Sequence, residues 1–138
     1  MRRTLIAAAL AALAALAGGA QAQDAGELEG IITEQMSAFM ADDFATAFTY
    51  ASPMIQSMFG TSANFGAMVR NGYPMVWRPA DIQFQEQRDG RRPGEIVQRL
   101  SVRGPDGSYY ICDYTMIETG AGWKINGVQV LPAPGVGA

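Results

Sequence analysis

Apolar residues in the first part of the chain recur every three or four positions. The series with this spacing is Leu28, Ile31, Ile32, Met36, Phe39 and Met40. Such spacing places side chains on one face of an α-helix. Asp24, followed three residues later by Glu27, fits a capping box at the start. The pattern predicts a long amphipathic helix that breaks at Asp42-Asp43.

Three shorter helical segments are predicted next, each with its own boundary signals. Asp43 can cap the first, and Ser52-Pro53 places a serine at the N-cap and a proline at the first helical position of the second. Gly60 ends that segment, and Thr61 or Ser62 caps the third. We therefore expect a helical first half.

The stretch from residue 64 to residue 79 marks the change from helices to strands. Asn71-Gly72 predicts a helix stop with Gly72 at positive φ, and Pro74 should prevent the helix from resuming. We expect residues 75–77 to be extended after this turn.

From Asp81 onward, apolar and polar residues alternate with a period of two. Glycine-rich turns at residues 90–94, 104–107 and 120–122 divide this region into about four strands. The alternation slips at Asn126-Gly127, which predicts a β-bulge that bends the sheet. The sequence thus predicts an α+β domain, with N-terminal helices packed on a curved antiparallel sheet of about four strands.

The chain begins with the pattern of an export signal. A basic Arg2-Arg3 pair precedes the apolar run from Leu5 to Leu16, and Ala20-Gln21-Ala22 fits a cleavage site. We expect a cleaved signal peptide over 1–22, a single domain over 23–131 and a flexible tail over 132–138. The protein would then be periplasmic or secreted, without membrane insertion because the apolar run is too short. General and twin-arginine export both stay open.

Composition narrows the chemistry. The chain has 13 acidic and 10 basic residues, and its net charge is −3. An acidic surface without a basic cluster argues against nucleic acid as a partner. With no histidine and one cysteine, Cys112, we expect no metal site, no catalytic triad and no cofactor. Cys112 alternates with two tyrosines and is predicted to be a buried, inert thiol.

Several motifs carry a family resemblance. The helices-first order, the link Gly-Tyr-Pro-Met-Val-Trp-Arg-Pro (72–79) and the closing Gly-Trp-Lys-Ile-Asn-Gly-Val (122–128) resemble the cystatin-like cone of the nuclear transport factor 2-like superfamily. More narrowly, the chain resembles the proteobacterial family called domain of unknown function 4864 over about residues 30–131. The motifs that carry this second resemblance are Gln35-x-x-Ala38-Phe39-x-x-Asp42-Asp43, Ala51-Ser52-Pro53, Phe59-Gly60 and Met68-Val69-Arg70-x-Gly72-Tyr73-Pro74.

The superfamily resemblance implies a cone-shaped pocket between helices and sheet, which other members use for isomerisation, dehydration, cyclisation or ligand binding. Glu86 alternates with Ile82 and Phe84, which places it on the same, inward face of the predicted strand. It is therefore the one weak catalytic candidate. A carboxylate at the rim that meets solvent or an arginine is the alternative.

The candidate ligand-binding residues are mostly aromatic. They are Arg70, Tyr73 and Trp77 at the mouth, Tyr50, Tyr110, Tyr114 and Trp123 deeper in the cone, and Gln98 on an otherwise apolar strand face. Each also has a structural explanation. Arg70 can bond the last carbonyls of its helix, the aromatics can belong to the core, and the Gln98 amide needs partners if it is buried.

These features favour a non-enzymatic, exported domain that binds a small molecule or a protein. The alternatives are a cofactor-free lyase or isomerase that uses Glu86, alone or with a tyrosine, and a structural module that self-associates. Val97, Ile111 and Ile117 should lie opposite the inward strand set and leave an apolar patch. We therefore expect a homodimer through the outer face of the sheet.

Overall fold

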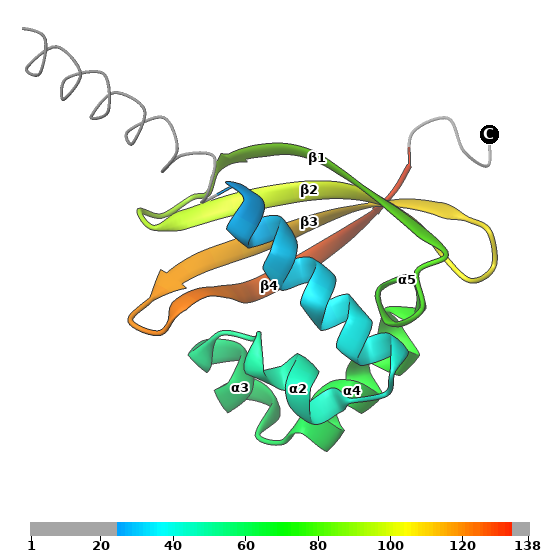
Figure 1. Cartoon of the computed structure of the whole chain (residues 1–138), viewed down its shortest axis with the longest axis horizontal. Coiled ribbons are helices and arrows are strands. Elements are labelled where there is room, and N and C mark those ends of the chain that lie inside the picture. The colour runs from blue at the N-terminus through cyan, green and yellow to red at the C-terminus, as the bar shows by residue number, and fades with distance from the viewer. Residues whose placement is uncertain (1–24, 134–138) are drawn as a thin grey trace, which may run out of the picture.

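The computed structural model describes residues 25–133, which form an α+β domain (Figure 1). The order of elements is a helix over residues 25–40, then α2 (Phe44–Thr49), α3 (Pro53–Phe59), α4 (Ser62–Gly72), α5 (Pro74–Trp77), β1 (Asp81–Asp89), β2 (Glu95–Arg103), β3 (Tyr109–Thr119) and β4 (Gly122–Pro132). The predicted fold class is confirmed. The expected signal peptide, the Asp24 cap and the last residues of the expected tail lie outside the described residues.

The helices α2, α3 and α4 begin where the sequence predicts. The side chains of Asp43, Ser52 and Thr61 each accept a hydrogen bond from the backbone N–H three residues later, at 3.1–3.3 Å. Each bond satisfies an N–H that has no partner inside its helix. Gly60 follows α3 with a φ of 77°, as expected for a glycine that ends a helix.

The link between helices and sheet differs from the prediction. Residues 75–77 are not extended: they belong to α5, which begins at Pro74. Gly72 closes α4 without positive φ, and Tyr73 (φ −135°, ψ 57°) joins the two helices. The physical reason is that proline is favoured at the first helical position, so Pro74 stops one helix and starts the next.

The strands form an antiparallel sheet in the order β1-β2-β3-β4. The sheet curves around the N-terminal helix, and the helices cover one face (Figure 1). The predicted bulge in β4 is confirmed, because Thr115 pairs with Gly127 and Met116 with Ile125, which leaves Asn126 over. Ile125, next to the bulge, also bonds the segment just before α3. Its N–H donates to the Tyr50 carbonyl, and its carbonyl accepts from the Ser52 N–H.

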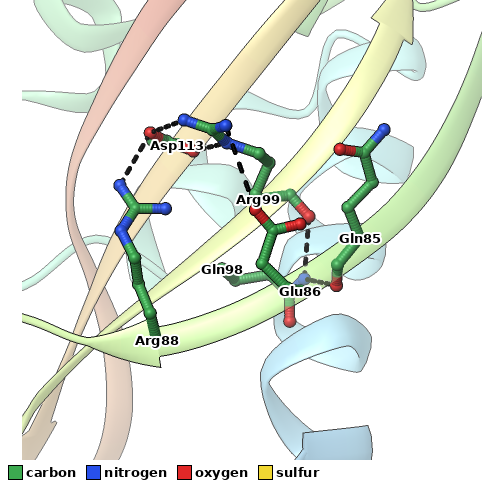
Figure 2. A network of polar contacts seen from close by, with 6 residues as sticks. All are labelled: Gln85, Glu86, Arg88, Gln98, Arg99 and Asp113. Carbon is green, nitrogen blue, oxygen red and sulfur yellow. Dashed lines mark hydrogen bonds and ion pairs between the residues drawn. The ribbon is translucent and has the colours of Figure 1, made fainter.

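A second bulge lies in β1 and was not predicted. Phe84 pairs with Leu100 and Gln87 with Gln98, so one extra residue is inserted between the two pairs. The inward position passes to Gln87, and the Glu86 side chain is 58% exposed on the outer face (Figure 2). Glu86 therefore does not point into the pocket. It meets solvent and Arg99, in agreement with the alternative that the sequence left open for this residue.

The core fills the space between the helices and the inner face of the sheet. Its largest fully buried apolar side chains are Tyr114, Phe39, Leu28, Ile32, Leu100, Met116, Val102 and Cys112. The buried Cys112 agrees with the prediction. α3 contributes no buried residue. Within residues 25–133, no helix is long and apolar enough to span a membrane.

Candidate functional site

A cavity of about 350 Å³ lies between the helices and β4. Its lining comes from the N-terminal helix, the segment before α3, α3, α4, the α4–α5 link, α5 and β4. These residues are Gln35, Phe39, Ala51, Ile55, Met58, Phe59, Phe65, Met68, Val69, Tyr73, Val76, Ile125, Gly127 and Val128. The volume falls within the range of small-molecule sites, roughly 300–1,000 Å³. The lining is apolar apart from Gln35 and Tyr73.

Gln35 is the buried polar group of this lining, with 3% of its surface exposed. Its Nε2 donates a hydrogen bond to the carbonyl of Ala47 in α2, at 3.2 Å. A carbonyl oxygen only accepts, so this contact fixes which end of the amide is nitrogen. The opposite end, Oε1, has no hydrogen-bond partner within residues 25–133. The sequence motif included Gln35, but its helical spacing indicated only a core position.

α3 forms the least buried wall of the cavity. Ile55, Met58 and Phe59 line the cavity from this helix, and Met58 is 65% exposed. The N-terminal end of α3 is anchored, because Ser52 Oγ donates to Asn126 Oδ1 at 2.6 Å. Its other end reaches Gly60. A helix with so few buried contacts is the wall that can open at the lowest cost in free energy.

Of the predicted ligand-binding residues, only Tyr73 lines this cavity. Arg70 is exposed, and its guanidinium carbon lies 5.9 Å from the centre of the Phe44 ring. The structure therefore places Arg70 against α2, where a cation over an aromatic ring is a stabilising contact.

Trp77 belongs to a structural clamp. Its Nε1 donates to Asp42 Oδ1 at 2.9 Å, and the Arg78 guanidinium lies over its ring at 4.3 Å. Arg78 also bonds Asp42 at 3.0 Å and the Phe39 carbonyl at 2.8 Å. Asp42 has a φ of 54°, in the left-handed region. Sequence reasoning missed Arg78; the acidic pair at the helix break was the available signal for a partner cation.

The remaining candidates lie in other surroundings. The Tyr50 hydroxyl donates to Glu34 Oε2 at 2.8 Å, and that bond raises the pKa of Tyr50. Tyr110 borders a separate hollow beside α5, and Trp123 packs half-buried against the core. Tyr114 is fully buried, and its hydroxyl has no partner among the described residues. Burial raises its pKa well above the ordinary value.

Gln98 is buried, and its amide is satisfied within the sheet. Nε2 donates to the carbonyls of Gln85 and Arg99, at 3.0 and 2.8 Å (Figure 2). Oε1 accepts from Gln87 Nε2. The Gln85 carbonyl belongs to the bulge in β1. Gln98 therefore supplies the hydrogen bond that the interrupted ladder lacks there.

A charged cluster occupies the outer face of the sheet (Figure 2). Arg99 and Arg88 both bond the Asp113 carboxylate, whose side chain is 7% exposed, and Glu86 lies 3.9 Å from Arg99. These contacts, led by the hydrogen bond from Arg99, lower the pKa of Asp113 to about 2, against the opposing effect of burial. Asp113 stays ionised near neutral pH, which does not suit a general acid or base.

The geometry favours binding over acid–base catalysis at the cavity. The described lining contains no carboxylate, lysine or arginine. The Cys112 thiol is buried, and burial raises its pKa to about 12, so it is not an activated nucleophile. The arrangement suits the enclosure of an apolar molecule.

Comparisons with curated proteins and with solved structures found no match. A family model described as domain of unknown function (DUF4864) matches residues 21–138. It covers most of the chain, including every described element, so the protein belongs to that family.

Proposed function

We propose that this protein is an exported, non-enzymatic domain that binds a small apolar molecule in the cavity between its helices and β4. The observation that carries the proposal is the apolar lining of a cavity of about 350 Å³, closed on one side by the weakly buried helix α3. Burial of apolar ligand surface contributes roughly 25 cal/mol per Å².

We also propose that the fold is a cone of the nuclear transport factor 2-like superfamily. The helices-first order, the curved sheet and a cavity between the two layers support this assignment. Export is supported by the Arg2-Arg3 pair, the apolar run and the Ala20-Gln21-Ala22 motif. N-terminal sequencing of the exported protein should find Gln23 first, and a retained run from Leu5 to Leu16 would contradict export with cleavage.

Native mass spectrometry of protein purified from its own compartment tests the ligand. Wild type should carry an added mass that organic solvent releases. Val69→Phe puts a larger side chain into the lining and should abolish the added mass. Ala63→Phe, on the exposed side of the same helix, is the matched control and should retain it. An added mass that persists unchanged in Val69→Phe would place the ligand elsewhere.

The competing proposal is a lyase or isomerase that uses Glu86 as its base. Glu86 does not belong to the cavity lining. Glu86 lies on the outer face beside Arg99, largely exposed. The described lining contains no carboxylate, so a reaction in this cavity would have to use Tyr73 as its acid or base.

We further propose that two copies associate through the outer face of the sheet. Val97, Ile111 and Ile117 are only half-buried there, and Tyr109 at the edge is exposed. Together they form an apolar surface around the charged cluster. Sedimentation should show a dimer that Ile111→Lys dissociates and Ala63→Lys, on α4, does not. A wild-type monomer at high concentration would contradict the proposal.

A further inference from the structure

The two ends of the Gln35 amide differ: Nε2 has a hydrogen-bond partner, and Oε1 has none among the described residues. Oε1 is not one of the fully buried atoms without a partner, so it keeps some contact with solvent. It lies on the buried face of the N-terminal helix among Ile32, Met36 and Phe39. A buried amide group costs free energy unless it is hydrogen-bonded. The bond from Nε2 to Ala47 satisfies the donor end and ties the helix to α2. The acceptor end, Oε1, is then the part of this lining side chain that is left for the cavity.

We infer that the ligand is an uncharged, mainly apolar molecule with one hydroxyl or N–H group, and that this group donates a hydrogen bond to Gln35 Oε1. The inference rests on the proposed function and adds the class of ligand. An oxygen that only accepts selects for a donor. A molecule without a donor would leave this oxygen unsatisfied when it displaced water from the cavity.

The charges around the cavity argue against an anionic ligand. No arginine or lysine belongs to the described lining, so a carboxylate or sulfonate would lose its hydration without gaining a cation. Arg70 lies over Phe44, and Arg78 is engaged by Asp42 and Phe39. Tyr73 is half-buried, and its hydroxyl can donate or accept, so it does not change this selection.

A purely structural Gln35 makes a different prediction. The contact to Ala47 uses only Nε2, so a structural role affects stability and the affinity for every ligand alike. The proposed role uses Oε1 and affects the ratio of affinities between a ligand with a donor and one without. This ratio is therefore the quantity to measure.

Three probes of nearly the same shape separate the cases. N-phenyl-1-naphthylamine is neutral with one N–H, 1-phenoxynaphthalene replaces that N–H with an ether oxygen, and 8-anilinonaphthalene-1-sulfonate adds an anion. Fluorescence titration and displacement give the three affinities. Wild type should bind the amine about 3- to 10-fold more tightly than the ether, the range expected for one net hydrogen bond, and should bind the sulfonate more weakly than the amine.

Gln35→Met keeps the length of the side chain and removes the acceptor. This variant should bind the amine and the ether about equally, with the affinity for the ether retained. The matched control is Gln56→Met, which removes another amide. Gln56 does not belong to the described lining, and its Nε2 donates to the carbonyls of Phe48 and Ala51. It should keep the wild-type preference for the amine.

Each result decides between specific statements. Equal binding of amine and ether by wild type, a preference that survives in Gln35→Met, or a sulfonate that binds as tightly as the amine would overturn the inference while the cavity remains a binding site. If no probe binds, and Val69→Phe behaves like wild type, the proposed function fails as well.

Should Gln35→Met not fold, an NMR measurement on wild type replaces this variant: the side-chain carbonyl ¹³C resonance of Gln35 is followed as each probe is added. It should shift with the amine and not with the ether, and equal shifts would overturn the inference.

Discussion

The guanidinium of Arg99 holds both carboxylate oxygens of Asp113, with Nε 2.8 Å from Oδ1 and Nη2 2.9 Å from Oδ2. Arg88 adds a third bond of 2.9 Å to Oδ2. Two-pronged contacts of this kind are among the stronger ion pairs. They stabilise the outer face across three neighbouring strands, and they have a measurable dependence on pH.

Asp113 should make stability fall in acid. The pKa of Asp113 is about 2 in the folded chain, below its ordinary value, so the unfolded chain takes up the proton first as pH falls. The contribution is therefore complete above about pH 5 and is lost as pH falls toward 2, by roughly 2 kcal/mol. Urea unfolding at a series of pH values should show a shallower acid slope for Asp113→Asn. Asp89→Asn, at an exposed position, should keep the wild-type slope, and parallel curves for all three proteins would contradict the assignment.

Cys112 should be unreactive in the folded protein. Burial is the main cause that raises the pKa of this thiol to about 12, and the nearby charge of Asp113 adds to it. Little thiolate forms at pH 8, and reagent cannot reach the sulfur. A thiol reagent should label the protein only after denaturation. Ser57→Cys adds an exposed thiol on α3 and should react in the native state. Rapid native labelling of wild type would show that the sheet face opens.

Arg78→Gln should destabilise the fold by about 1–3 kcal/mol. An exposed ion pair alone contributes little, but this change also removes the bond to the Phe39 carbonyl and the stacking on Trp77. Arg78→Lys should not restore stability, because an ammonium cannot reproduce the planar contact with all three partners. Arg91→Gln, at an exposed position in the β1–β2 turn, is the control. Thermal unfolding measures the difference, and equal melting temperatures for the two glutamine variants would contradict the clamp.

Two glycines of α4 should respond in opposite ways to alanine. A Cβ at Gly66 would lie 2.5 Å from Cγ of Phe44, so Gly66→Ala should cost about 1–3 kcal/mol despite the better helix propensity of alanine. A Cβ at Gly72 would meet nothing within 4 Å, and its φ is not positive, so Gly72→Ala should stabilise by roughly 0.4–1 kcal/mol. Chemical denaturation of both variants tests the pair. Strong destabilisation by Gly72→Ala would restore the left-handed helix end that the sequence predicts there.

The sequence alone was sufficient for the starts of α2, α3 and α4, the strands and one bulge. The caps at Asp43, Ser52 and Thr61 depend on a side chain and a backbone N–H only three residues apart, so the relevant contact is local. The bulge at Asn126 was visible because a glycine interrupts the alternation of apolar residues. Short-range signals of this kind need no knowledge of neighbouring elements.

The position of Glu86 and the polar lining of the cavity were decided only by the tertiary structure. Residues 81–84 alternate, and the polar run Gln85-Glu86-Gln87 that follows carries no signal for a bulge. The bulge is completed by Gln98 from the adjacent strand, which bonds the Gln85 carbonyl. Likewise, Gln35 has a helical core spacing, and only the tertiary structure brings its Nε2 to the Ala47 carbonyl in α2 and places the residue in the cavity lining. Register and the direction of a buried polar atom depend on partners distant in sequence, because each must satisfy its hydrogen bonds and fill space against another element.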